Sequence, residues 1–231
     1  MFIRDIILMN TKPLFSERHG YQAPTVSITV RYEAPGFLRR GILSVALKSG
    51  FNARALRSII CEALDSLPDE AQNWSDPNVL NECEGLIDNC EWFEVYDICE
   101  IFARKDATDR FFEKGLNNFF LKKGIGWKME GGVLSVRGEG DYEQITTEAK
   151  SLLHDSGRPT ALNELKHAGE DLSKRPEPDV TGAIQHSMAS LECLAREVSG
   201  SKGTLGAFIK DRNLPKPVDT AVEKMWAFAS E

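Results

Sequence analysis

Three acidic side chains lie at regular intervals in the segment from Glu91 to Ala103, and they are the first candidates for chemistry. Glu94, Asp97 and Glu100 are three residues apart, which places them along one side of a helix. Clustered carboxylates of this kind can hold a divalent metal ion or exchange protons. A solvated acidic helix face has the same pattern, so the spacing alone favours the structural interpretation.

Asp97 differs from the other two carboxylates because it lies between Tyr96 and Ile98 in an apolar stretch. A charged group in such surroundings is normally paired with an opposite charge. We expect Arg39 or Arg40 to supply that charge, so that the side chain serves the structure and not a reaction.

Basic and aromatic residues gather around a second segment, where Lys122, Lys123, Trp127, Lys128 and Arg137 follow one another within 16 residues. Cations that alternate with aromatic rings can hold a phosphate backbone and stack on bases, so these residues are candidates for RNA binding. The alternative is a helix whose final lysines interact with its dipole, followed by a tryptophan in the core.

The four histidines, His19, His154, His167 and His186, show no second histidine, cysteine or carboxylate at metal-ligand spacing. A Ser-His-Asp or Cys-His set cannot be assembled from the sequence, and no glycine-rich phosphate loop is present. We therefore expect no metal, no cofactor and no complete catalytic site in this chain.

Two polar residues, Ser187 and Glu192, flank the apolar stripe of a long predicted helix. A buried glutamate requires a partner. We expect both residues to make hydrogen bonds at the edge of that helix.

Helical periodicity positions most of these residues. Apolar side chains recur at intervals of three and four from residue 37 to about residue 228, which is typical of packed amphipathic helices. Asn52, Asp76, Thr160 and Asp179 stand where helix caps are expected.

Two segments depart from this helical period. Residues 127–137 form two short alternating runs joined by Gly131 and Gly132, which predicts a β-hairpin because glycine permits the positive φ angles of a tight turn. Thr25 to Tyr32 is rich in β-branched residues and predicts one short N-terminal strand. The expected fold class is mainly α, in two helical parts, with this small hairpin.

The sequence Ser156 to Pro159 reads as a linker, and we place a domain boundary there, between residues 1–156 and 157–231. The N-terminal apolar stretch is short and interrupted by Arg4 and Asp5, unlike a signal peptide.

Composition narrows the class of protein. The net charge of −7 argues against a protein that coats nucleic acid by bulk charge, although a local basic groove remains compatible with it. The five cysteines are odd in number and have apolar neighbours, which is typical of reduced thiols in a cytoplasmic protein. No apolar run is long enough to cross a membrane.

Several segments together resemble a known family. Phe15 to Tyr21 (FSERHGY), Leu38 to Ile42 (LRRGI), Glu91 to Ile101 (EWFEVYDICEI) and the run LNNFFLKKGIGWKME are similar to the N-terminal domain of AbiJ-type abortive-infection proteins. Gly182 to Gly200 (GAIQHSMASLECLAREVSG) and the following TLGAFIKD resemble the helical domain that comes next in those proteins, which is similar to the HEPN fold.

This resemblance implies a bacterial anti-phage protein with a sensing or regulatory N-terminal domain and a HEPN-like domain that cuts RNA without a metal, as a homodimer. In active HEPN ribonucleases an arginine and a histidine stand four to six residues apart, and in this family the motif would follow the helix that contains Trp226. Before Glu231, no arginine is followed by a histidine four to six residues further along the chain. Either the polypeptide is truncated or the protein is an inactive regulator.

The expected partners are RNA, a phage component or a regulatory protein, with no membrane. A non-enzymatic interaction protein that binds RNA or protein is the alternative function. A metal-dependent hydrolase built on Glu94, Asp97 and Glu100 is a more distant one.

Overall fold

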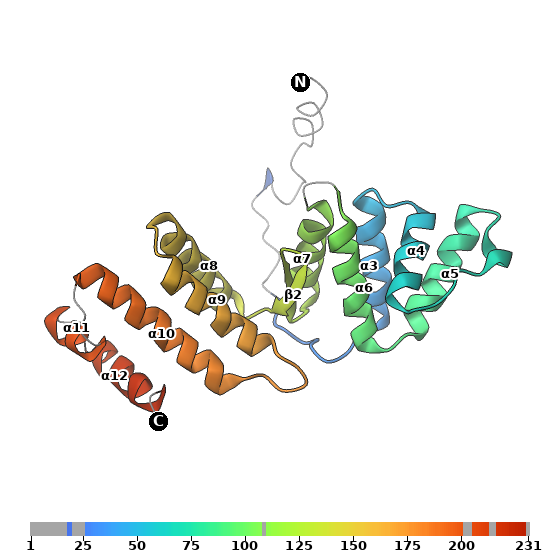
Figure 1. The fold of residues 1–231 in the computed structure, drawn as a ribbon. Coiled ribbons are helices and arrows are strands. Elements are labelled where there is room, and N and C mark those ends of the chain that lie inside the picture. The colour runs from blue at the N-terminus through green and yellow to red at the C-terminus, as the bar shows by residue number, and fades with distance from the viewer. Residues whose placement is uncertain (1–17, 20–25, 108–109, 201–204, 213–215, 230–231) are drawn as a thin grey trace, which may run out of the picture.

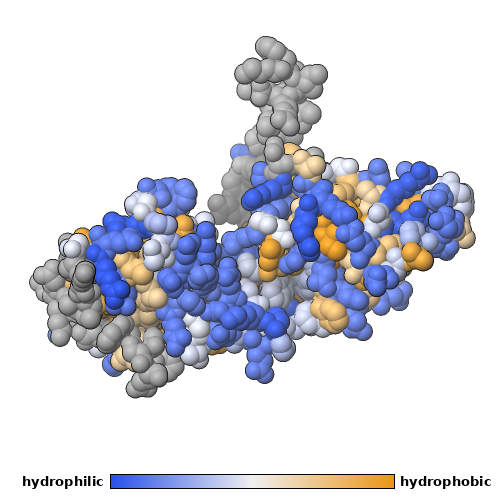
Figure 2. All heavy atoms as spheres, in the orientation of Figure 1, coloured by the Kyte–Doolittle hydropathy of each residue, from blue (hydrophilic) through white to orange (hydrophobic). Residues whose placement is uncertain are grey.

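A computed structural model describes residues 18–19, 26–107, 110–200, 205–212 and 216–229. The fold is mainly α, as predicted, and its helices form two bodies on either side of a β-hairpin (Figure 1). Figure 2 shows that hydrophilic residues predominate on the face of the molecule that is seen in Figure 1. Most of the segment Phe15 to Tyr21 and the terminal Glu231 lie outside the described residues.

The first body comprises helices α3 to α7 and the hairpin. The bounds are α3 Gly36–Lys48, α4 Ala53–Ala63, the short 3-10 helix η1 Glu70–Gln72, α5 Asp76–Asn89, α6 Trp92–Lys105, α7 Phe111–Lys123, β1 Trp127–Glu130 and β2 Val133–Val136. The second body comprises α8 Gly140–Asp155, α9 Pro159–Ser173, α10 Val180–Ser199, α11 Leu205–Arg212 and α12 Val218–Ala229. None of the helices described is long and apolar enough to span a membrane.

The core of the first body contains a group of aromatic rings among aliphatic side chains. Phe102, Phe112 and Phe120 are fully buried, and the rings of Phe102 and Phe112 lie 5.2 Å apart. Burying each such side chain contributes roughly 1.5–3 kcal/mol to folding. This core fixes α3, α6, α7 and β1 against one another and so determines which surface residues become neighbours.

Helix caps explain several of the helix starts. Asn52 accepts a hydrogen bond from the N–H of Ala55 at 2.9 Å, and Asp179 accepts one from Gly182 at 2.8 Å, so both predicted caps are confirmed. The predicted cap Asp76 is wrong, because the side chain of Ser75 accepts the hydrogen bond and Asp76 is the first helical residue.

The hairpin is confirmed over residues 127–136. Gly131 and Gly132 have φ angles of 63° and 84°, and Met129 stands opposite Leu134 in the antiparallel register. Alternate residues of such a hairpin point their main-chain groups outward. Asn117 of α7 pairs with both outward groups of Met129.

Two outward N–H groups of β2 are also paired. Glu100 of α6 accepts the N–H of Leu134 at 2.9 Å, and Ser173 of α9 accepts the N–H of Val136 at 3.0 Å. The hairpin is therefore tied by side chains to helices of both bodies.

The strand predicted over Thr25 to Tyr32 is wrong over its described residues. Thr25 lies outside them, and between residues 26 and 32 only Val30 forms a bridge, parallel to Ile125. The physical reason is that the neighbouring chain is the turn after α7, where only Gly124 and Gly126 offer main-chain partners. The segment therefore lies against the turn without forming a strand.

The second body is a layer of helices in which α9 and α10 pack side by side (Figure 1). Leu153 of α8 shares a small apolar cluster with Ala161 of α9. The helix predicted to be capped by Thr160 begins instead at Pro159, whose fixed φ angle and missing N–H suit the first helical position. The boundary after Ser156 stays a prediction.

Candidate functional site

The acidic triad is used mainly by the fold. Glu94 accepts the N–H of Glu91 at 2.7 Å at the start of α6, and Glu100 accepts the N–H of Leu134 in the hairpin. Asp97 is mostly exposed. The part of its carboxyl group that is buried raises its pKa, and the nearby carboxylates of Glu100 and Glu94 raise it further. Two of the three carboxylates thus have structural partners, which weakens the hydrolase interpretation.

The expected pairing of Asp97 with Arg39 or Arg40 is wrong. Arg39 donates to three main-chain carbonyls, before α3 and at the end of α5. Arg40 lies 2.5 Å from Glu84 and 2.7 Å from Asp88. The packing of α3 on α5 turns both guanidinium groups away from α6, and the sequence could not show which helix would be the neighbour.

Two of the RNA-binding candidates, Trp127 and Arg137, are buried in the junction between the bodies. Trp127 is 7% exposed, and its Nε1 donates to the carbonyl of Arg31 at 2.8 Å. The guanidinium of Arg175 lies over the same ring, 4.7 Å from its centroid. Arg137 donates through Nε to Ile125 at 2.8 Å. Neither side chain is free to stack on a base or bind a phosphate.

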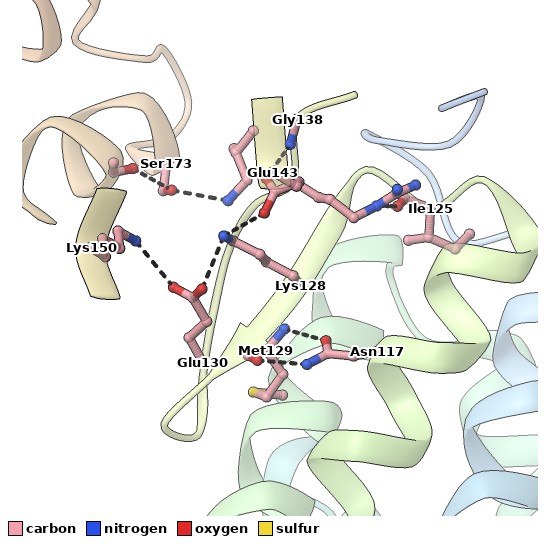
Figure 3. Close-up of polar contacts among 12 residues, drawn as sticks. Asn117, Ile125, Lys128, Met129, Glu130, Gly138, Glu143, Lys150 and Ser173 are labelled. Atoms are coloured by element: carbon pink, nitrogen blue, oxygen red, sulfur yellow. Dashed lines mark hydrogen bonds and ion pairs between the residues drawn. The ribbon is translucent and has the colours of Figure 1, made fainter. Parts of the chain in front are cut away.

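The side chain of Lys128 is also paired within this junction (Figure 3). Its Nζ lies 2.9 Å from Glu130 and 2.7 Å from Glu143, and Lys150 of α8 approaches Glu130 at 3.8 Å. Burial acts to lower the pKa of Lys128, but the hydrogen bonds and charges of Glu143 and Glu130 raise it overall. Glu143 also accepts the N–H of Gly138, so this network ties α8 to the hairpin.

Lys122 and Lys123 are exposed, and the structure places Lys122 on a basic surface that the sequence did not predict. It lines a groove of about 680 Å³ between α3 and α7, together with Lys48 and Lys114. The remaining lining residues are small, polar or aromatic, and none is acidic: Gly41, Ser44, Val45, Ser49, Phe111, Gly115, Asn118 and Phe119. We call this surface the α3–α7 groove. Lys123 does not line it.

Two glycines create the α3–α7 groove by letting its helices approach. A Cβ atom on Gly41 would lie 2.0 Å from the ring of Phe119, and one on Gly115 would lie 3.1 Å from Val45. These two contacts run in opposite chain directions, so the helices are antiparallel. Lys114 and Lys122 are eight residues apart on α7, about 12 Å along the helix axis. The groove therefore carries positive charge over its length.

The sequence offered only a weak signal for this groove. Glycines inside predicted helices indicate close packing, but they do not say which helices meet. Lys48 and Lys122 line one groove only because α3 packs on α7, and the antiparallel packing places them toward opposite ends of it.

The structure overturns the statement that no histidine has a metal-ligand partner. Glu164 and His167 lie three residues apart on α9, and His186 of α10 lies beside them, so that one ligand atom from each falls within 4.8 Å of the others. The pairing of α9 with α10 could not be read from spacing. The three-residue interval between Glu164 and His167 is visible in the sequence.

The two polar residues of α10 make the helix-edge contacts expected for them. Ser187 donates to the carbonyl of Ala183 at 2.7 Å, and Glu192 lies 2.7 Å from Arg196. Both contacts lie within one helix.

The chain matches a known protein family. The family model described as AbiJ N-terminal domain 4 matches residues 13–150, a range that includes the α3–α7 groove, the hairpin and most of α8. No curated protein and no solved structure matches the chain.

Proposed function

Because the chain belongs to the AbiJ N-terminal domain 4 family, we propose that it acts in bacterial anti-phage defence as an abortive-infection protein whose first body binds RNA in the α3–α7 groove. The observation that carries the RNA proposal is the set of three lysines, Lys48, Lys114 and Lys122, in a groove without an acidic lining residue. In a chain with a net charge of −7, such a local concentration of positive charge is distinctive.

Electrostatics and stacking both support a single-stranded ligand. Three lysines can contact three phosphates, and Phe111, which is 53% exposed, offers a ring at the groove. Aromatic faces stack on bases without regard to sequence. Neutralising three phosphates of single-stranded RNA gives a log-log salt slope of about −2, or roughly a twentyfold loss of affinity between 50 and 200 mM salt.

The second body is proposed to be a HEPN-like effector domain, on the resemblance of the α10 segment GAIQHSMASLECLAREVSG to that fold. The four helices α9 to α12 support this proposal, since HEPN domains are helical bundles. RNA cleavage and homodimer formation through this body are part of the same proposal. Incubation of the purified protein with RNA, together with its mass in solution, tests them.

Charge reversal at two adjacent lysines tests RNA binding. Lys122→Glu changes a residue of the groove, and Lys123→Glu makes the same charge change on the same helix outside it. Fluorescence anisotropy with labelled single-stranded RNA should show a loss of about tenfold to thirtyfold for Lys122→Glu, because an attraction of about 1 kcal/mol in water becomes a similar repulsion. Lys123→Glu should change affinity much less.

A non-enzymatic protein-binding function is the second candidate. It is favoured by large apolar side chains on either side of η1, where Leu67 is 91% exposed and Trp74 is 76% exposed. If Lys122→Glu and Lys123→Glu leave RNA affinity equal to that of the unaltered protein, the groove proposal is wrong and this candidate becomes the better one.

A further inference from the structure

The histidine cluster of the second body has the donor set of a transition-metal site. Glu164 and His167 come from α9, and His186 comes from α10. Oε2 of Glu164 lies 2.7 Å from Nδ1 of His186, and the rings of the two histidines lie 5.2 Å apart between centroids. Two imidazoles and one carboxylate are ligands that Zn²⁺ prefers, whereas Mg²⁺ and Ca²⁺ prefer oxygen alone.

A buried carboxylate provides the second observation. Asp171 is 6% exposed, and its Oδ2 is fully buried without a hydrogen-bond partner. That oxygen lies 3.7 Å from Nε2 of His186, on the side of the ring opposite Glu164. Metal-binding histidines usually direct their second nitrogen at a carboxylate, which fixes the tautomer and orients the ring. Asp171 is placed to do this for His186 while Nδ1 faces Glu164.

Backbone packing holds this arrangement. A Cβ atom on Gly182 would lie 2.6 Å from Oδ2 of Asp171. Glycine thus allows the start of α10 to approach α9 at this point. His186 follows Gly182 by four residues and so lies on the same face of α10, one turn further along. The position of the helix backbone, together with its own contacts, therefore directs the side chain of His186 toward α9.

The cluster is open to solvent. His167 is exposed, and the side chains of Glu164 and His186 are 26% and 38% exposed. A metal ion can therefore enter, and water can complete its coordination. Zinc sites of this kind have three protein ligands, and a water molecule or substrate takes the fourth position.

We propose that Glu164, His167 and His186 bind one Zn²⁺-class ion, with Asp171 orienting His186, and that the ion clamps α9 to α10. This inference does not depend on RNA binding in the first body. The clamp joins residues 22 positions apart in the chain. An ion that binds only the folded protein stabilises it by an amount that grows with the logarithm of the ion concentration relative to the dissociation constant.

The test uses the full chain without a histidine tag, stripped of metal by a chelator. Isothermal titration with Zn²⁺ should show one equivalent bound with a micromolar or tighter dissociation constant, and Zn²⁺ should raise the melting temperature. Binding of Co²⁺ should give the visible absorption of a site with nitrogen and oxygen ligands.

Variants separate the site from incidental binding. His167→Ala should weaken Zn²⁺ binding at least tenfold, and because His167 is exposed this variant should fold. His186→Ala should do the same, and Asp171→Asn should cost about tenfold to hundredfold through the second nitrogen. The matched control is His154→Ala, since His154 is exposed and its side chain contacts only Asp155 among the interactions described. The proposal is overturned if no stoichiometric binding occurs at 100 µM Zn²⁺ (about 5 kcal/mol of affinity), or if His167→Ala and His186→Ala bind as tightly as His154→Ala.

Discussion

Arg175 joins the two bodies through its planar guanidinium, and its removal should loosen the junction. The side chain follows α9 and lies over two rings of the first body, 4.7 Å from the centroid of Trp127 and 5.4 Å from that of Tyr32. Arg175→Ala removes both contacts and leaves the Trp127 ring without its cover.

The magnitude follows from the burial of each ring. Trp127 is 7% exposed, so its contact with the cation is largely desolvated and is worth about 2 kcal/mol, whereas Tyr32 is 54% exposed and adds about 0.5–1 kcal/mol. The sum of about 2–3 kcal/mol corresponds to a fall in Tm of about 4–12 °C for a chain of this size. Arg175→Lys keeps the charge but loses the planar stack. Its Tm should therefore lie between those of the unaltered protein and Arg175→Ala.

The assay combines thermal unfolding with ¹⁹F NMR of the protein labelled with fluorotryptophan. Four tryptophan lines are expected, and Trp127→Phe identifies the line that Arg175→Ala should shift. Arg196→Ala is the matched control, because Arg196 is an exposed arginine of the second body whose partner, Glu192, lies on its own helix. A loss below about 0.5 kcal/mol for Arg175→Ala, with an unmoved Trp127 line, would refute the proposed role of the stack.

Three further predictions concern the first body. Arg57 and Glu82 form an ion pair at 3.2 Å with side chains 10% and 9% exposed, so Arg57→Met should destabilise the protein by about 3–5 kcal/mol in urea unfolding; a cost below 1 kcal/mol would contradict this. Because its pKa is raised, Asp97 destabilises the folded state when ionised, so its contribution to stability falls as the pH rises from 3.8 through the raised pKa. Asp97→Asn should therefore raise the melting temperature at pH 7 but not below pH 3.8, the ordinary value, and a gain independent of pH would exclude the titration as its cause. Burial raises the pKa of Cys83 to about 12, so iodoacetamide at pH 8 should leave this thiol unmodified in the folded protein, and mass spectrometry showing rapid modification would disprove it.

Periodicity predicted what local sequence controls. Phe112, Leu116 and Phe120 follow one another at intervals of four, and all three are fully buried on one face of α7. Gly131 and Gly132 fixed the turn of the hairpin, because few other residues tolerate their φ angles. In each instance the information lies within a few residues of the element it predicts.

Side-chain partners could not be predicted in the same way. Lys122 and Lys128 are lysines six residues apart, yet one lines an open groove and the other is paired with Glu130 and Glu143. The difference arises because β1 turns its residue toward α8. Residue type determines which chemistry a side chain can perform. The packing of distant helices determines whether that side chain is accessible to a ligand or already paired within the protein.

The paired outward groups of the hairpin have a consequence for solubility. A two-stranded sheet normally presents unpaired amides along both edges, which can recruit strands from other molecules and start aggregation. Here Asn117 occupies one edge, and Glu100 and Ser173 occupy the other. Ser173 belongs to the second body, so cleavage of the chain near Ser156 would release a first fragment whose Val136 N–H is exposed. In the intact protein Ser173 covers this N–H, so we expect the second body to reduce pairing of β2 with strands of other molecules.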